Sequence, residues 1–429
     1  MAHPFVSNSN LLHRSFSQQP EKVISASGVS LFLESGQEVL DASAGPAVSC
    51  LGFGRPEITK VVVNQMNGHP GGLSKAIFVN SGSEATDAAI KLATQYWHER
   101  GMPQKHHFIA RKQSYHGNTI GALCVSGHDS RRAMYRHWLS HNVSFVDPCF
   151  AYRLKEDVDE SDEAYVKRLA DQLEAEILRV GPENVSAFVA ETVSGTTLGC
   201  VPAVPGYFKT IRQICDNYDI MCGMGKTGTM HAWEQEDISG PDIQMIGKAL
   251  CGGFVPLSGV LLRDKIFDAL ADGSGRLAHG HTFQAHPVAC AAALEVQRIV
   301  REENLPKRVQ EMGKTLETLL KTHISPLKFV GDIRGRGLFW AVEFVQDIRS
   351  KTPFPASMRL CHRIVDKALE LGLNILGNLG DTGDVHVDHV IISAPYVVNK
   401  NELERMVGIL REAMEGMISE VVNAPEQRL

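Results

Sequence analysis

The sequence predicts an α/β protein with a mostly parallel sheet in a large domain, followed by a small α+β domain. Between about residue 75 and residue 303, buried strands alternate with amphipathic helices, an order typical of βαβ units. Beyond residue 325 the pattern changes to short strands and helices, which indicates a second domain. The expected parts are an N-terminal segment over 1–50 that joins the small domain, a large domain over 51–303 and a small C-terminal domain over 304–429.

The individual elements follow from local periodicity. Residues 29–41 predict a β-hairpin, because two apolar runs flank the polar sequence Glu-Ser-Gly-Gln. A helix over 83–100 places several alanines, Leu92 and Tyr96 on one face. Further strands are expected at 75–80, 107–111, 187–191 and 255–262, and further helices at 164–180, 207–217, 287–303 and 305–322. A second hairpin is expected over 330–344, and a last helix begins with the capping-box spacing of Asn399 and Glu402.

The composition excludes several classes of protein. Hydrophobic residues make up 43% and charged residues 21% of the 429 residues, which is the balance of a soluble globular protein. The net charge of -6 argues against nucleic-acid binding, and no apolar run is long enough to span a membrane. The nine cysteines are scattered without zinc-site spacing, so we expect no metal, reduced thiols and, without a signal-peptide pattern, a cytoplasmic location.

Lys248 is the most informative single residue. It follows the short apolar stretch of Pro241-Asp-Ile-Gln-Met-Ile and precedes a turn of small residues that ends at Gly253. An amine held rigidly with space in front of it can form a Schiff base with a carbonyl compound. Taken alone, a solvated lysine is the commoner interpretation of such a sequence.

Three other segments supply groups that suit an anionic, planar ligand. Asn80-Ser-Gly-Ser-Glu-Ala85 lies between a strand and a helix, where backbone N–H groups and hydroxyls can hold a phosphate, although an ordinary helix cap explains it equally well. Ser114-Tyr-His-Gly117 follows a strand of the same sheet, so Tyr115 could stack on a planar ring or simply pack at the surface. Thr282 precedes a helix and could offer a further hydroxyl.

The segment Gly223-Met-Gly-Lys-Thr-Gly228 matches a dinucleotide-binding pattern and the end of a P-loop. A P-loop requires a glycine where Ile220 stands, and the dinucleotide pattern requires a following helix that the sequence does not predict. We therefore do not interpret this segment as a nucleotide site.

In this order, the segments closely resemble the class III pyridoxal-phosphate-dependent aminotransferases of fold type I. The matching sequences are Asn-Ser-Gly-Ser-Glu-Ala at 80–85, Ser-Tyr-His-Gly at 114–117, Val-Ala-Glu at 189–191, Gly-Met-Gly-Lys-Thr-Gly at 223–228, Pro-Asp-Ile-x-x-x-Gly-Lys-Ala-Leu at 241–250, His-Thr-Phe-x-x-His-Pro at 281–287 and Gly-Asp-Ile-Arg-Gly-Arg-Gly at 331–337. The resemblance extends from about residue 25 to the C-terminus.

The resemblance implies a role for each site residue. Lys248 would hold pyridoxal 5'-phosphate through a Schiff base and then move protons, while Gly82 and Ser83 would bind its phosphate. Tyr115 would lie against the ring, with His116 beside it, and Glu191 would line the site near the ring. Thr282 would reach the phosphate of a neighbouring subunit, which implies a homodimer. The implied reaction moves an amino group from a small amine or amino acid to a keto or aldehyde acceptor.

The chain departs from the family at two places. Relatives carry an aspartate, which pairs with the ring nitrogen, on a buried strand before the Gly-x-Gly turn, but here the helix ending near Asp216 runs directly into Met221. We therefore expect that strand to be missing from the sheet, and an ungapped count puts Tyr218 at the position of the aspartate. Asp219 or Asp216 as a substitute remains open. The segment between Gly54 and Lys75 is also short, and two such excisions favour a variant transcript or gene model over gradual drift.

Two alternatives to an aminotransferase remain at this stage. One is a pyridoxal-phosphate-dependent isomerase, racemase or decarboxylase, because relatives with the same lysine site catalyse these reactions. The other is a non-catalytic homologue, which the missing aspartate favours. The amino donor and acceptor cannot be identified from the sequence, although Arg334 and Arg336 are candidates for binding a substrate carboxylate or for a structural role.

Overall fold

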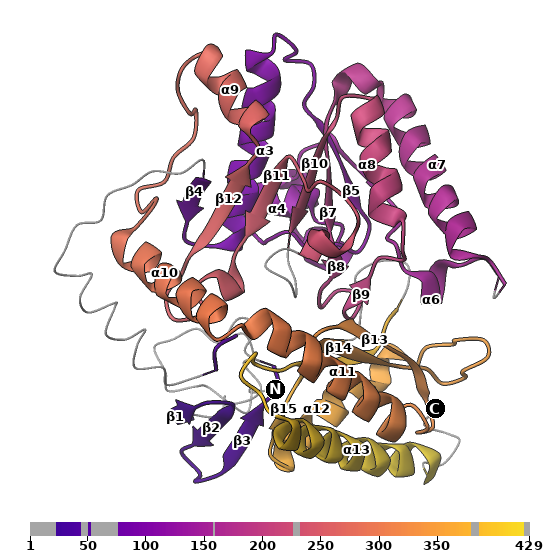
Figure 1. Ribbon diagram of the computed structural model, residues 1–429. Helices are drawn as coiled ribbons and strands as arrows, with labels where there is room; N and C mark the ends of the chain where they lie inside the picture. Colours follow the sequence, from indigo (N-terminus) through magenta and orange to yellow (C-terminus); the bar gives the residue numbers. More distant parts are fainter. Residues whose placement is uncertain are drawn as a thin grey trace, which may run out of the picture.

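The large sheet organises the N-terminal two thirds of the molecule (Figure 1). The computed structural model describes residues 23–43, 50–52, 76–157, 159–225, 232–378 and 386–423. Within these ranges the large sheet has seven strands, in the order β4 (Ala76–Val79), β12 (Ser258–Leu262), β11 (Ile243–Ile246), β10 (Met221–Gly225), β7 (Val185–Glu191), β5 (His107–Arg111) and β6 (Val143–Val146). Only β12 among them runs antiparallel to its neighbours, so the predicted mostly parallel sheet is confirmed.

Helices cover both faces of this sheet. Alternate residues of β7 point to opposite sides of the sheet. Ala187 and Val189 pack in the cluster beneath α3 (Gly82–Glu99), while Phe188 and Ala190 pack beneath α7 (Asp162–Val180) and α8 (Tyr207–Asn217). The longer helices are α3 (Gly82–Glu99), α7 (Asp162–Val180), α8 (Tyr207–Asn217), α9 (Asp264–Asp272) and α10 (Pro287–Glu302). None of the helices in the described ranges is long and apolar enough to cross a membrane.

Short elements connect these helices and strands. The short helices are α4 (Ile120–Val125), α5 (Asp129–Ala133), α6 (Ala151–Leu154), η1 (Arg136–Trp138), η2 (Pro182–Asn184), η3 (Ala232–Gln235) and η4 (Lys248–Leu250). Two short strands, β8 (Val193–Ser194) and β9 (Val201–Pro202), form a small antiparallel pair after β7.

The expected gap in the sheet does not exist, so that prediction is wrong. Residues Met221–Gly225, for which the sequence predicts no strand, form the central strand β10 and pair in parallel with both β7 and β11. Unpaired backbone N–H and C=O groups are costly in the middle of a sheet. The next five residues of the chain therefore occupy the strand position, even though two of them are glycines.

The glycines of β10 leave the packing beneath α3 incomplete. A cavity of about 30 Å³ lies between α3 and the sheet, and Met221, Val189 and Ile243 are among the residues that line it. Gly223 pairs with Val189 on one side and with Ile243 on the other, and it shares a strand face with Met221. The cavity therefore borders the two residues with which Gly223 pairs.

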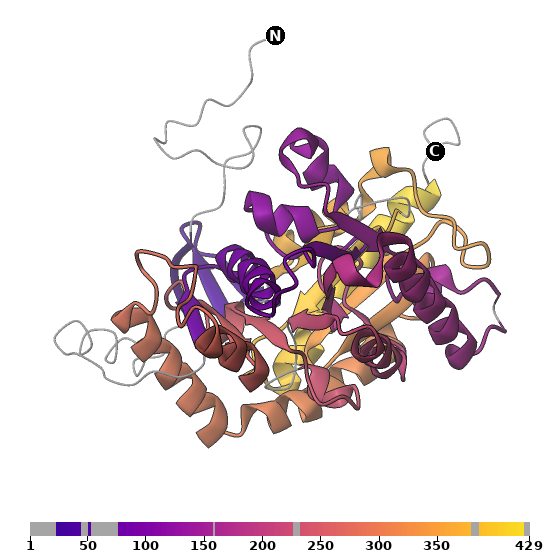
Figure 2. The ribbon, with the colours of Figure 1, turned by 90° about the horizontal axis from the view of Figure 1, so that it is seen from above.

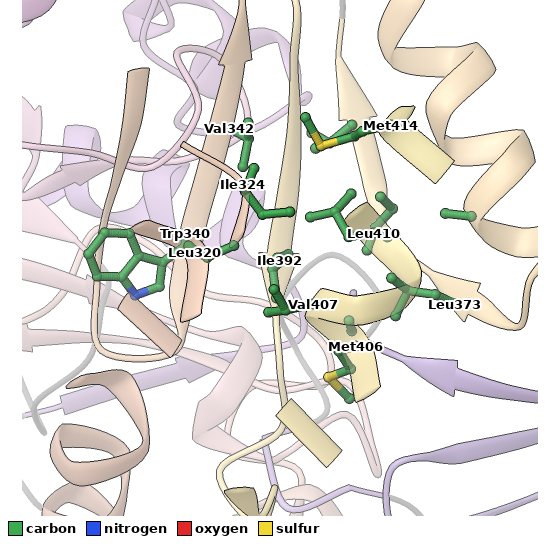
Figure 3. Close-up of a cluster of buried hydrophobic side chains, with 14 of the residues drawn as sticks. Leu320, Ile324, Trp340, Val342, Leu373, Ile392, Met406, Val407, Leu410 and Met414 are labelled. Carbon is green, nitrogen blue, oxygen red and sulfur yellow. The ribbon is translucent and has the colours of Figure 1, made fainter. Parts of the chain in front are cut away.

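The C-terminal elements form a smaller part with its own core. Its sheet has the order β13 (Val330–Arg336), β14 (Phe339–Phe344), β17 (His389–Ser393) and β16 (Leu376–Asn378), so the predicted second hairpin is confirmed. The helices are α11 (Leu305–His323), η5 (Ala356–Met358), α12 (Leu360–Glu370) and α13 (Lys400–Asn423). Figures 1 and 2 show α10 and α11 following one another, in orange, across the boundary between the two parts. In Figure 3, Trp340 and Val342 of β14 face a cluster that includes Val407 and Leu410 of α13.

The N-terminal strands belong to this smaller part. The strands β1 (Val23–Ser27), β2 (Ser30–Leu33) and β3 (Glu38–Asp41) are antiparallel, which confirms the predicted first hairpin. β3 also pairs in parallel with β15 (Leu373–Asn374), and Val29 and Leu40 join the C-terminal core. The domain limits given above remain predictions. The shortened segment between Gly54 and Lys75 lies outside the described residues.

Buried ion pairs join the two parts. Glu343 of β14 is fully buried, and its carboxylate accepts a hydrogen bond of 2.6 Å from Arg153 Nε of α6. Its second oxygen lies 2.5 Å from Arg334 Nη1. Arg334 also donates to the backbone oxygens of Gly199 at 2.7 Å and Leu198 at 2.5 Å, so one guanidinium ties β13 to the loop that follows β8.

Candidate active site

The carboxyl ends of the parallel strands bring most of the predicted site residues to one edge of the sheet. Ser83 follows β4, Tyr115 follows β5, Glu191 ends β7 and Lys248 follows β11. All four strands run in the same direction, because β12 is antiparallel to both β4 and β11. In open α/β sheets this edge is where ligands bind.

The N-terminus of α3 is shaped to accept an anion. Ser81 caps the helix, with the Glu84 N–H donating to Ser81 Oγ at 3.2 Å, while the Glu84 carboxylate accepts from the Ser81 N–H at 3.1 Å. The helix supplies no carbonyl partner for the N–H groups of Gly82 and Ser83. A Cβ atom placed on Gly82 would meet nothing within 4 Å, so the space beside this helix end is open. These N–H groups and the helix dipole together favour a bound phosphate.

The loop after β5 is fastened to this helix end. Gly117 has φ of +144°, and a Cβ atom there would lie 2.7 Å from Ser83 Oγ, so only glycine fits this position without displacement. The next residue, Asn118, donates its N–H to Ser83 Oγ at 2.9 Å. The contact holds the loop that carries Tyr115 and His116 against the N-terminus of α3.

Tyr115 and His116 present two kinds of ring. The guanidinium of Arg131 lies 4.9 Å from the centroid of the half-buried Tyr115 ring. His116 Nε2 is buried without a hydrogen-bond partner among the described residues, and burial lowers the pKa of His116 to about 3. The imidazole is therefore neutral near pH 7.

Glu191 is the buried carboxylate at this edge. Its Oε2 atom is buried and has no hydrogen-bond partner among the described residues. Burial raises the pKa of its carboxyl group, while the charges of Arg111 and Lys248 and the backbone N–H groups of Tyr115 and Gly195 act in the opposite direction. These influences place Glu191 close to three separate segments of the site.

Lys248 lies at the same edge of the sheet with an exposed side chain. It begins the turn η4, and its φ of +50° is unusual for a residue with a side chain. The preceding residue, Gly247, is close to the helix end: a Cβ atom there would lie 2.5 Å from Ser258 Oγ and 4.0 Å from Gly82 Cα. The backbone that carries the amine therefore lies directly against the proposed anion site.

Thr282 is the one predicted site residue that lies apart from the strand ends. It is exposed in the turn before α10, and this turn is tied to β4 by a hydrogen bond of 3.0 Å from the Ala285 N–H to the Phe78 carbonyl. No contact given by the structure joins it to Lys248 or Ser83 within the described ranges.

The model of the family described as Aminotransferase class-III matches residues 65–414. The chain belongs to the class III aminotransferase family. This membership confirms the predicted family and favours transamination over the isomerase, racemase and decarboxylase alternatives.

Relatives and solved structures agree with the assignment over nearly the whole enzyme. An uncharacterised aminotransferase of Schizosaccharomyces pombe is 41% identical and covers 95% of both chains, and one of Bacillus subtilis is 32% identical over 91% of this chain and 94% of its own. The alignment with the yeast relative extends over 440 positions, more than the 429 residues of this chain, so the yeast relative has residues that this chain lacks. The ω-transaminase of Pseudomonas jessenii, solved in complex with PMP, superposes with a TM-score of 0.89 at 29% identity, covering 97% of this chain and 98% of its own.

The open question of a substitute aspartate is answered against both candidates. Asp219 lies before β10, at the amino end of the sheet, where Lys105 Nζ donates to its carbonyl at 2.7 Å. The five residues of β10, about 16 Å of extended chain, separate it from the edge with Lys248. The Asp216 carboxylate pairs with Arg212 on its own helix, and the Tyr218 hydroxyl donates to Glu174 of α7 at 2.7 Å. None of these three residues reaches the site.

The two candidate arginines for substrate binding have structural partners. The Arg334 side chain is only 8% exposed and is held by Glu343, Asp332 and two carbonyls, as described above. Arg336 Nη1 lies 2.7 Å from the buried carboxylate of Glu236. The structural alternative stated from the sequence therefore fits both residues.

Sequence reasoning missed Arg111 and Gly247. Arg111 ends β5, is buried, and donates through Nη2 to the Glu191 carbonyl at 2.5 Å. An arginine that ends an apolar strand could have been recognised from the sequence. Charged residues are rarely buried without a partner, so its position indicates an anionic or carbonyl partner nearby. Residue 247 must be a glycine because Ser258 and Gly82 lie close to it. Both are distant in sequence, so the local pattern around residue 247 does not show this requirement.

Proposed function

We propose that the chain catalyses pyridoxal-phosphate-dependent transamination with Lys248 as the residue that attaches the cofactor covalently. The observation that carries this proposal is the convergence of an exposed lysine, an open helix N-terminus and a buried carboxylate at one sheet edge. Its partners are a small-molecule amino donor and a keto or aldehyde acceptor. The family assignment supports this chemistry.

The residues present fit pyridoxal phosphate. Gly82 and Ser83 offer backbone N–H groups and a hydroxyl to the phosphate, because the space beside Gly82 is open. Tyr115 supplies an aromatic face for the ring, and the unpartnered Nε2 of the neutral His116 offers a further polar contact. The buried, unpartnered Oε2 of Glu191 requires a hydrogen-bond donor that the described residues do not provide.

The chain's own residues would orient and move protons. The cofactor, when bound, acts as a sink for the electrons released from the amino substrate. Lys248 Nζ would hold the cofactor and would also be the group that accepts and returns a proton beside the substrate. The left-handed turn at Lys248 and the close packing of Gly247 keep this amine in place.

A homodimer is the proposed assembly. The turn that holds Thr282 also exposes the side chain of Phe283, at 62%, and α10 beyond it exposes Leu294, at 68%. Large exposed apolar side chains beside a predicted site residue fit an interface with a second copy, in which Thr282 would approach the partner's phosphate. The cytoplasm is the proposed location, as the scattered cysteines of the sequence favour.

Covalent trapping tests the attachment site. After incubation with pyridoxal phosphate and borohydride reduction, peptide mass spectrometry is expected to find the label on Lys248. Visible absorption from the bound cofactor is expected to vanish in Lys248→Ala and to persist in Lys314→Ala, a control at an exposed lysine of α11. Labelling spread over several surface lysines would contradict the proposal.

Product analysis then tests the reaction. A labelled amine is expected to be converted to a carbonyl compound only when a keto or aldehyde acceptor is present. Carbon dioxide release or isomerisation without an acceptor would instead favour the alternative reactions. A cofactor-loaded protein that is inactive with every donor would favour the non-catalytic homologue.

Light scattering tests the assembly. The wild type and Leu178→Glu, which changes an exposed leucine of α7, are expected to be dimers, whereas Phe283→Glu shifts towards monomers. A monomeric wild type that still holds the cofactor would exclude the proposed dimer.

A further inference from the structure

The central strand of the sheet brings no carboxylate to the site. The sequence of β10 is Met-Cys-Gly-Met-Gly, and the nearest aspartates lie at the opposite end of the sheet or on α8. A pyridoxal-phosphate enzyme normally provides a charged partner for the pyridine nitrogen. Strand β10 therefore supplies no carboxylate partner for the pyridine nitrogen in the proposed site.

The neighbouring strand β7 ends in a carboxylate, at the level where β10 also ends. Glu191, the last residue of β7, pairs in register with Gly225, the last residue of β10. Adjacent strands are separated by about 4.8 Å, so the end of β7 lies immediately beside the end of β10. Because residue 225 is a glycine, it adds no side chain between them.

The surroundings of Glu191 leave one oxygen available. Burial is the largest influence on Glu191 and raises the pKa of its carboxyl group, whereas the backbone N–H groups of Tyr115 and Gly195 and the charges of Arg111 and Lys248 act in the opposite direction. A Cβ atom on Gly195 would lie 3.8 Å from Oε1, whereas Oε2 is buried and has no partner among the described residues. A buried carboxylate oxygen without a donor is costly, and this cost is removed when a ligand supplies one.

Two other acidic side chains of neighbouring segments are already engaged. The Glu84 carboxylate caps α3, and Glu236 pairs with Arg336. Glu191 is therefore a carboxylate near Lys248 that keeps a buried oxygen without a hydrogen-bond partner among the described residues.

We infer that Glu191 accepts the hydrogen bond from the protonated ring nitrogen of the cofactor, in place of the aspartate that β10 lacks. This inference rests on the proposed function. It assigns Glu191 a defined atom of the cofactor rather than a general place near the ring. No bond is made or broken, and the carboxylate holds the proton on the nitrogen by its charge.

A cofactor analogue isolates the interaction. The full-length protein is titrated with pyridoxal phosphate and with its 1-deaza analogue, in which a C–H group replaces the ring nitrogen, and dissociation constants are measured by equilibrium dialysis. Glu191→Gln is expected to weaken binding of pyridoxal phosphate about tenfold and to change binding of the analogue less than about twofold. Glu311→Gln, an exposed change on α11, is expected to leave both constants unchanged.

The outcomes separate this inference from the proposed function. If the wild type binds pyridoxal phosphate on Lys248 but Glu191→Gln weakens both compounds equally, or neither, Glu191 does not contact the nitrogen and the inference is wrong. If the wild type binds neither compound, the proposed function fails and the inference fails with it. Circular dichroism of Glu191→Gln confirms that a loss of affinity does not come from unfolding. Glu191→Asp, which keeps the charge but shortens the side chain, is expected to lose less affinity than the glutamine variant.

Discussion

At the scale of single residues, two glycines at the N-terminus of α3 differ in the space available for a side chain. Gly117→Ala places a methyl group 2.7 Å from Ser83 Oγ at a φ of +144°, so we expect a loss of about 1–3 kcal/mol in stability and weaker cofactor binding. Gly82→Ala meets nothing within 4 Å, so stability is expected to stay within about 0.5 kcal/mol while the methyl group fills the proposed phosphate space. Thermal unfolding and cofactor titration of both variants measure the difference. Equal loss of stability would show that the space beside Gly82 is not open.

The buried charge of Glu191 predicts a pH dependence of the cofactor-free protein. Burial raises the folded pKa of Glu191 above its ordinary value of 4.5, so the folded state holds a proton that the unfolded state has released. The stability contributed by the protonated group is present below about 4.5 and is lost as the pH rises through the folded pKa, by about 1.4 kcal/mol for each pH unit that separates the folded and unfolded pKa values. Glu191→Gln is therefore expected to be more stable than the wild type at pH 7, with a difference that shrinks towards pH 4. Denaturant unfolding across this range measures it, and a constant difference would contradict the prediction.

At the scale of elements, the periodicity of apolar residues located strands and helices where packing is local. The strand His107–Arg111 and the helix Tyr207–Asn217 have the predicted limits, because each buries one continuous face. β10 was missed because Met-Cys-Gly-Met-Gly lacks the β-branched and aromatic residues typical of strands. Its strand form is imposed by β7 and β11 on either side, and pairing of this kind is not encoded in five residues. The site residues at strand ends were predictable because local apolar patterns show where each strand ends. The contact of Arg111 with Glu191 was not predictable, because it depends on the order of the strands in the sheet.

The incomplete packing around β10 predicts that a small addition is stabilising. Gly223→Ala is expected to raise stability by about 1 kcal/mol, because alanine restricts the unfolded chain and the cavity bordered by Val189 and Ile243 has room for a methyl group. The matched change Gly259→Ala in β12 would bring its Cβ atom to 3.2 Å from Phe78, so we expect little gain or a loss there. Denaturant unfolding of the two variants gives the comparison. A gain at both positions would mean that glycine entropy alone, rather than the cavity, explains the effect.

At the scale of the whole molecule, the site depends on how the two parts are held together. The sequence identified Arg334 by its motif but left its role open, because Glu343 and Arg153 lie far from each other along the chain. In the structure these residues meet between α6, β13 and β14, and Arg334 also holds the loop between Glu191 and β9 through the carbonyls of Leu198 and Gly199. The smaller part therefore supports, through buried charges, the segment that positions the carboxylate of the site.

This arrangement predicts the largest single-residue effect on stability. Glu343→Gln leaves the buried guanidinium of Arg153 without its charge partner and removes one of the two carboxylate partners of Arg334, so we expect a loss of about 3–5 kcal/mol. Arg363→Gln breaks an exposed pair with Glu420 in the smaller part, and its cost is expected to stay below about 1 kcal/mol. Denaturant unfolding without cofactor measures both changes, since bound cofactor would add its own stabilisation. If the two variants lose the same amount, the buried pairs do not hold the parts together. If Glu343→Gln unfolds at low denaturant and also binds cofactor weakly while still folded, the coupling between the interface and the loop after Glu191 accounts for both results.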